Sequence, residues 1–195
     1  MPLNIPNALT WARILLIPLF LGVFYLPGSW MTMPERNLFA TATFALAAAT
    51  DWFDGYLARR LQQTSPFGAF LDPVADKLMV AAALIMLAEL ERISALVAFI
   101  IIGREITISA LREWMAKLGE SRSVAVSYIG KVKTAAQMTA IPLLLYHDPL
   151  AGVNVHFMGS ILILLAVVLT LWSMVFYLKM AWPVLAGNGK VTQKS

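Results

Sequence analysis

Long apolar stretches recur along this chain with only short polar breaks between them, and they restrict its fold more than any other feature. Hydrophobic residues make up 59% of the 195 residues and charged residues only 13%, an apolar excess relative to soluble domains. A helix needs about 20 mostly apolar residues to cross a bilayer. The sequence therefore predicts an all-α integral membrane protein with six transmembrane helices. The expected spans are 9–26, 37–57, 72–88, 94–114, 127–146 and 157–180.

These spans fill nearly the whole sequence, which leaves no room for a sizeable soluble domain. We expect one membrane-embedded domain over 1–195, with a short interfacial segment at 1–8 and a cytoplasmic tail at 181–195. The first apolar stretch is not expected to be a cleaved signal, because Arg13 is the only basic residue before it and no small-residue cleavage pattern follows it. The absence of cysteine excludes disulfides, thiolate metal sites and cysteine nucleophiles.

The distribution of basic residues predicts the orientation. Of the 15 lysines and arginines, Arg36 and Arg92 lie in odd-numbered loops, and the other 13 lie on the opposite side or in spans leading to it. Because short cytoplasmic loops collect basic residues, both termini are expected in the cytoplasm, with the protein in the cell inner membrane. The net charge of +4 is explained by this topology signal. It forms no basic stripe with interleaved aromatic residues, so no nucleic-acid partner is expected.

Four aspartates lie in or beside two adjacent spans, where charged groups are costly and usually functional. Asp51 and Asp54 are three residues apart near the end of the second span, and Asp72 and Asp76 are four apart at the start of the third. Each spacing places a pair on one helix face. Since a short loop joins the two spans, all four carboxylates are expected to meet at the cytoplasmic side.

Carboxylates gathered in this way repel one another unless a cation neutralises them. Oxygen donors without cysteine, and with His147 and His156 expected on the other side, favour Mg²⁺ or Mn²⁺. The alternative is that each aspartate caps a helix or forms an ion pair with a nearby basic side chain. It suits Asp72, which precedes Pro73 at a favoured first-turn position. It does not suit Asp51 and Asp54, because the helix dipole disfavours anions near a C-terminus.

Small and basic residues accompany these acids in a fixed pattern. The sequence reads D-x-x-D-G-x-x-A-R, then eight residues, then G-x-x-x-D-x-x-x-D. Glycine and alanine mark close helix packing or clearance for a bulky ligand, and arginine is a fork-shaped donor suited to a diphosphate. The eight positions are Asp51, Asp54, Gly55, Ala58, Arg59, Gly68, Asp72 and Asp76.

This string resembles the signature of the CDP-alcohol phosphotransferase family at all eight positions. The resemblance implies a six-helix membrane fold, usually dimeric, with a site for two divalent ions that opens to the cytoplasm. It implies Asp51, Asp54 and Asp72 as metal ligands, with Asp76 as the general base that also contacts a metal. It further implies a cytidine diphosphate pocket lined by Gly55, Ala58, Arg59 and Gly68.

Two basic stretches bear on the second substrate. Arg104 and Arg112 recur at four-residue steps with Ile108 between them, and Lys131 and Thr134 are three apart. Basic residues that converge near the acids favour an acceptor that already carries a phosphate. Simple anchoring at the membrane surface, or an Arg104 to Glu105 pair, are alternatives. The expected phosphate-binding residues are Arg104, Arg112, Lys131, Lys133 and Thr134.

These stretches, with the segment at 6–13, closely resemble the family members whose acceptor is sn-glycerol 3-phosphate. The likeness runs over 4–177. It implies transfer of the phosphatidyl group of CDP-diacylglycerol to glycerol 3-phosphate, and it implies that Asn7, Thr10 and Arg13 help to close the nucleotide pocket. Inositol phosphate, serine or phosphatidylglycerol as acceptors stay open. A divalent-cation transporter is an alternative of another class, but it favours acids at the bilayer midplane.

Overall fold

The fold is taken from a computed structural model of the chain. The structure describes residues 5–61, 66–118, 128–150 and 152–185, without the side chains at 5–7, 52–61, 66–67, 69, 128 and 183–185. Within these ranges it is all-helical, as expected. The helices are α1 (Ile5–Gly22), the short 3-10 helix η1 (Val23–Tyr25), α2 (Met33–Leu61), α3 (Pro66–Glu89), α4 (Ala95–Lys117), α5 (Tyr128–Tyr146) and α6 (Val155–Leu185).

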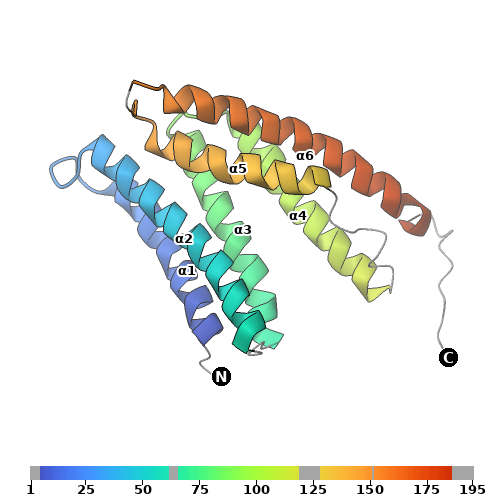
Figure 1. The fold of residues 1–195 in the computed structure, drawn as a ribbon. Helices are drawn as coiled ribbons and strands as arrows, with labels where there is room; N and C mark the ends of the chain where they lie inside the picture. Colours follow the sequence, from blue (N-terminus) through green and yellow to red (C-terminus); the bar gives the residue numbers. More distant parts are fainter. Residues whose placement is uncertain (1–4, 62–65, 119–127, 151, 186–195) are drawn as a thin grey trace.

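The helices form two groups that meet along a shared core. Figure 1 shows α1, α2 and α3 side by side, with α5 and α6 lying together across them and α4 beneath α6. The core gathers large side chains from different helices, among them Phe20 of α1, Phe44 of α2 and Leu84 of α3. Because α1 packs against both α2 and α3, it lies beside the segments that carry the four aspartates.

Helices α5 and α6 approach each other closely at a glycine. A methyl group added at Gly159 of α6 would meet Cγ of Leu144 of α5 at 2.8 Å. A side chain at this position would force Leu144 to shift, since atoms do not approach so closely. Gly159 therefore allows α6 to pack closely against the C-terminal end of α5.

The end of the molecule away from the aspartates is fixed by two arginines. Arg92, between α3 and α4, donates hydrogen bonds to the backbone oxygens of Leu144 and Leu145 at 3.1 and 2.6 Å, and to Oδ1 of Asn37 at 2.6 Å. Arg36 donates to backbone oxygens in the connection between α1 and α2. These bonds satisfy carbonyl groups at helix ends that have no partner within the helix.

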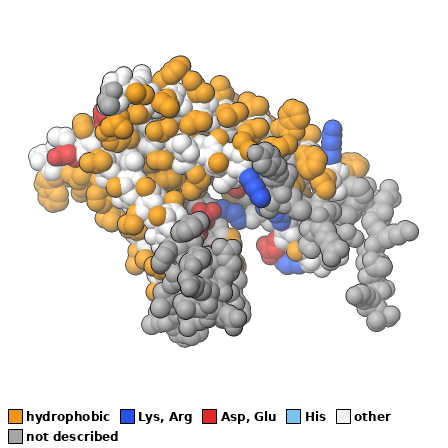
Figure 2. All heavy atoms as spheres, in the orientation of Figure 1, with side chains coloured by type: hydrophobic (Ala, Val, Ile, Leu, Met, Phe, Trp, Pro, Cys, Tyr) orange, Lys and Arg blue, Asp and Glu red, His pale blue; other side chains and the backbone are white. Residues whose placement is uncertain are grey.

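Apolar side chains cover much of the outer surface. Figure 2 shows an expanse of hydrophobic groups above a hollow in which acidic and basic groups gather. By length and composition, the described helices contain two windows apolar enough to cross a membrane, Ala8–Tyr25 and Val155–Trp182, of which only 22% and 33% is buried. Apart from core residues such as Phe20 and Ile163, most residues of these two windows are not buried in the protein, which fits a lipid surrounding. The count of six spans stays a prediction.

Candidate functional site

Three of the four signature aspartates have described side chains, and two of them contact α1. Nη1 of Arg13 donates a hydrogen bond to Oδ1 of Asp51 on α2 at 2.6 Å. The hydroxyl of Thr10 donates to Oδ1 of Asp72 on α3. Thr10 and Arg13 are both buried, with the arginine only 1% exposed. One face of α1 thus contacts an aspartate of α2 and an aspartate of α3. The role of Thr10 and Arg13 in closing a nucleotide pocket stays a prediction.

Helix α3 begins earlier than expected, which changes the reading of Asp72. The helix starts at Pro66, so Asp72 lies in its second turn and Pro73 lies inside it. The suggested role of Asp72 as a helix cap is therefore wrong. The span was expected to start later because Ser65, Pro66 and Gly68 are residue types common in loops. Proline is, however, also favoured in the first turn of a helix.

The aspartates provide the donor type that hard divalent ions prefer, since carboxylate oxygens bind Mg²⁺ and Mn²⁺ well. Among the described side chains, no three acidic or imidazole groups come together closely enough to hold one ion. The side chain of Asp54, the fourth member, lies outside that description. His147 and His156 contact each other with ring centroids 4.7 Å apart, beyond the far end of α5, and so do not join the acids.

Only some of the residues predicted to bind the nucleotide have described side chains. Thr10 and Arg13 reach the aspartates, and Gly68 is buried near the start of α3. Four other members of this set lie where side chains are not described: Asn7, Gly55, Ala58 and Arg59.

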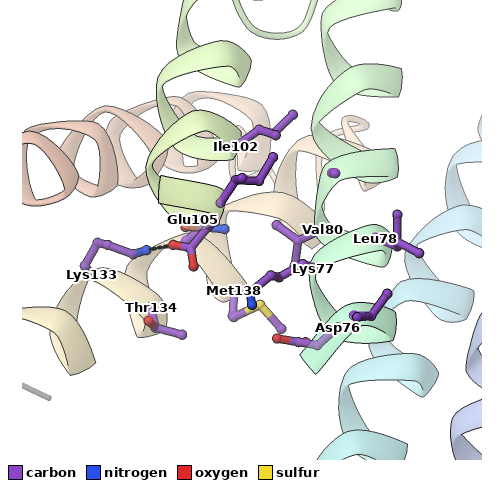
Figure 3. Close-up of a pocket in the computed structure, with 13 residues that line it drawn as sticks. Asp76, Lys77, Leu78, Val80, Ile102, Glu105, Lys133, Thr134 and Met138 are labelled. Atoms are coloured by element: carbon purple, nitrogen blue, oxygen red, sulfur yellow. Dashed lines mark hydrogen bonds and ion pairs between the residues drawn. The ribbon is translucent and has the colours of Figure 1, made fainter. Parts of the chain in front are cut away.

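A cavity of about 240 Å³ lies between α3, α4 and α5 and includes Asp76 in its wall. Figure 3 shows Asp76 and Lys77 on the α3 side, Glu105 on the α4 side, and Lys133 and Thr134 on the α5 side. Most of the remaining lining is apolar. The cavity therefore joins the expected general base to two of the five residues expected to bind the acceptor phosphate.

Lys133 and Glu105 form a buried ion pair at this cavity. Nζ of Lys133 donates a hydrogen bond to Oε1 of Glu105, and Nη1 of Arg104 donates to the same oxygen at 3.2 Å. Lys133 is 2% exposed, and a buried charge is tolerated only when it is paired and hydrogen-bonded. Glu105 thus compensates two of the cations expected to bind phosphate. The Arg104 to Glu105 pair considered as an alternative is present.

The two arginines of α4 also meet α6. Their guanidinium carbons lie 5.6 Å (Arg104) and 5.1 Å (Arg112) from the ring centroid of Tyr177, which is fully buried. Arg112 donates to the Tyr177 hydroxyl at 2.9 Å, and Arg104 donates to Ser173 at 3.0 Å. The expected shared face of Arg104 and Arg112 is therefore confirmed. It is turned toward α6, and neither arginine lines the cavity.

The remaining two acceptor candidates differ in position. Thr134 lines the cavity, and its hydroxyl donates a hydrogen bond to the backbone oxygen of Gly130 at 2.9 Å. Lys131 is exposed and is not part of the cavity wall. The structure thus brings Lys133 and Thr134 to Asp76, connects Arg104 to them through Glu105, and leaves Lys131 apart.

Sequence reasoning overlooked several polar residues of this region. Gln137 lines the cavity one turn beyond Lys133, and Ser173 and Tyr177 hold the α4 arginines. Gln137 could have been found from its spacing, because it continues the Lys133 face of α5 at the next helical turn. The residues on α6 carried no such signal, since their partners lie about 65 residues earlier in the chain.

Comparison with known proteins places this arrangement in a family. A sequence model described as CDP-alcohol phosphatidyltransferase matches residues 3–172. A Pseudomonas fluorescens protein named CDP-diacylglycerol–glycerol-3-phosphate 3-phosphatidyltransferase is 52% identical over 192 residues, covering 96% of this chain and 95% of the relative. Relatives of the same name from Yersinia enterocolitica and Salmonella typhimurium are also 52% identical, over 93% of this chain and 97% and 96% of their own lengths.

Proposed function

This chain belongs to the CDP-alcohol phosphatidyltransferase family, and we propose that it transfers the phosphatidyl group of CDP-diacylglycerol to sn-glycerol 3-phosphate. A bond forms between an acceptor oxygen and the lipid phosphorus, the bond from that phosphorus to the bridging oxygen breaks, and CMP leaves. The observation that carries the proposal is the 52% identity over nearly full length with relatives named for this reaction.

The proposed metal ligands are Asp51, Asp54, Asp72 and Asp76, with two ions of Mg²⁺ or Mn²⁺. Their carboxylate oxygens have the right chemistry for such ions. Bound divalent ions would neutralise the phosphate charge and hold the attacking and leaving oxygens in line. Two of these carboxylates also accept hydrogen bonds from α1, Asp51 from Arg13 and Asp72 from Thr10.

The nucleotide half of the substrate is proposed to lie between α1 and the aspartate-bearing ends of α2 and α3. The buried position of Arg13 beside Asp51 supports this, because a guanidinium is a fork-shaped donor suited to a diphosphate. The proposed contacts are Asn7, Thr10, Arg13, Gly55, Ala58, Arg59 and Gly68.

The acceptor half is proposed to enter the cavity between α3, α4 and α5. Asp76 lines it and is proposed to take the proton from the attacking hydroxyl. Lys133 and Thr134 line the same space and are proposed to bind the acceptor phosphate. Arg104 and Arg112 support the pocket from α4 through Glu105 and Tyr177, and the exposed Lys131 contributes positive charge from outside the cavity wall.

The membrane arrangement follows from the same reaction. The lipid tails can stay in the bilayer while the soluble acceptor arrives from the cytoplasm, so we propose a multi-pass inner-membrane protein with both termini and the site on the cytoplasmic side, acting as a homodimer. The chain lacks cysteine, so single-cysteine variants report topology cleanly. In intact spheroplasts, an impermeant maleimide is expected to label Ser29→Cys but not Ser195→Cys. The reverse pattern would overturn the orientation.

The function is tested with purified protein, CDP-diacylglycerol and labelled glycerol 3-phosphate. The proposal predicts that label enters the lipid phase with an equal amount of CMP. Inositol phosphate, serine and phosphatidylglycerol are assayed beside it, and faster transfer to any of them would replace glycerol 3-phosphate as the acceptor. No CMP release with any acceptor would overturn the transferase reaction.

A further inference from the structure

A buried amide faces the cavity with one of its atoms unbonded. Gln137 of α5 is 4% exposed and lines the cavity. Within the part of the chain that the structure describes, no group donates a hydrogen bond to its Oε1. Buried polar atoms of proteins are nearly always hydrogen-bonded, and leaving one unbonded destabilises the fold. An acceptor oxygen held in this way next to a cavity is placed to take a hydrogen bond from a ligand.

Resting on the proposed function, we propose that Oε1 of Gln137 binds the acceptor by accepting a hydrogen bond from the sn-2 hydroxyl of glycerol 3-phosphate. The unbonded atom is an acceptor, so it selects a group that donates. The oxygens of a phosphate dianion only accept, which excludes the phosphate itself as the partner. A hydroxyl that does not react is the remaining donor on this substrate.

The positions of the other polar residues agree with a small phosphorylated polyol. Asp76 lines the cavity from α3 and Lys133 and Thr134 line it from α5 (Figure 3). Gln137 lines it from the next turn of α5. In this placement of glycerol 3-phosphate, the reacting hydroxyl lies at Asp76 and the phosphate lies at Lys133. The middle hydroxyl then lies nearest to Gln137. The cavity of about 240 Å³ lies just below the range of roughly 300 to 1,000 Å³ typical of drug-sized ligands, which suits a molecule of this size.

The test is a double cycle between enzyme and substrate. The enzymes are wild type and Gln137→Met, which keeps the length of the side chain and removes the amide. The substrates are glycerol 3-phosphate and 3-hydroxypropyl phosphate, which lacks only the middle hydroxyl. We measure kcat/KM for each acceptor from CMP release at saturating CDP-diacylglycerol.

Wild type is expected to prefer glycerol 3-phosphate by about tenfold or more, because a site built to bind a hydroxyl discriminates against an analogue that lacks it. In Gln137→Met this preference is expected to fall to about one, through a loss on glycerol 3-phosphate alone, with the KM for CDP-diacylglycerol unchanged. Thr139→Val is the matched control. Thr139 is exposed on the same helix, and among the described residues its hydroxyl donates to the backbone oxygen of Ala135, so the preference should persist.

The outcomes separate this inference from the function beneath it. If wild type does not transfer to glycerol 3-phosphate, the proposed function and this inference both fail. If it does, but Gln137→Met keeps the same preference, only the role of Gln137 is overturned. Gln137→Asn shortens the side chain by one methylene and is the second variant, used if Gln137→Met does not fold. It must also weaken the preference for glycerol 3-phosphate over 3-hydroxypropyl phosphate.

Discussion

Arg13 of α1 and Asp51 of α2 lie 38 positions apart in the chain, yet Nη1 of the arginine donates to Oδ1 of the aspartate at 2.6 Å. The arginine is almost completely buried, while the side chain of Asp51 is 45% exposed. The cation is thus fixed by the fold and the anion remains open to the site. This asymmetry suits an arginine that holds a substrate phosphate beside acidic residues.

Replacing this arginine should weaken nucleotide binding. We expect Arg13→Met to raise the KM for CDP-diacylglycerol by at least about tenfold, since hydrogen bonds to charged groups contribute about 1.5 to 3 kcal/mol and about 1.4 kcal/mol corresponds to tenfold. The KM for glycerol 3-phosphate should change little. Lys117→Met is the control, because Lys117 is 72% exposed in a surface pair with Glu113. An unchanged KM for CDP-diacylglycerol in Arg13→Met would contradict the nucleotide role.

Replacing the proposed proton acceptor should stop turnover while CDP-diacylglycerol still binds. Asp76→Asn preserves the shape of the side chain and is expected to lower kcat by roughly 10²- to 10⁴-fold, the usual contribution of a general base. Single-turnover CMP release measures the chemical step, and equilibrium binding of CDP-diacylglycerol measures what is retained. Near-normal rates in this variant would remove Asp76 from the base role.

The two lysines at the start of α5 should differ in their effect on the acceptor. Lys133 lines the cavity and pairs with Glu105, whereas Lys131 is exposed away from it. We expect Lys133→Met to raise the KM for glycerol 3-phosphate by about tenfold or more, with the loss of a charged hydrogen bond. Lys131→Met should give a distinctly smaller rise. Equal effects of the two substitutions would show that general surface charge, and not the cavity, attracts the acceptor.

The close contact between α5 and α6 predicts a stability effect far from the chemistry. Gly159→Ala inserts a methyl group at 2.8 Å from Leu144 and is expected to destabilise the protein by about 1 to 3 kcal/mol, as overpacking does. Gly103→Ala, where the added methyl group meets nothing within 4 Å, should leave the melting temperature in detergent equal or higher. A Gly159→Ala variant as stable as wild type would mean that the two helices can separate without cost.

Much of the helical layout could be predicted from the sequence, because each apolar stretch is long and ends at polar or proline-containing breaks. The expected span at 127–146 nearly coincides with α5, and the one at 94–114 lies almost entirely within α4, which Ser94 caps. The start of α3 was missed by six residues, since its first turn is rich in loop-forming residues. Proline and glycine occur both in loops and near helix starts, so their presence does not distinguish the two.

The contacts across helices could not be predicted from spacing. Helical periodicity places Arg104 and Arg112 on one face, but it does not say that Tyr177 of α6 lies against that face. In the same way, Lys133 was expected near a phosphate, and its pairing with Glu105 emerges only when α4 and α5 pack together. Which helices become neighbours depends on tertiary packing, which a single sequence does not specify.

Metal dependence tests the central claim most directly, because the acidic cluster is proposed to work only with bound divalent ions. Purified protein with CDP-diacylglycerol and glycerol 3-phosphate is stripped with a chelator and assayed for CMP release, then supplied with Mg²⁺ or Mn²⁺, in parallel with Asp72→Asn. We predict that chelation abolishes CMP release, that either ion restores it in wild type, and that neither ion restores it in the variant. Turnover that survives complete chelation would contradict the account.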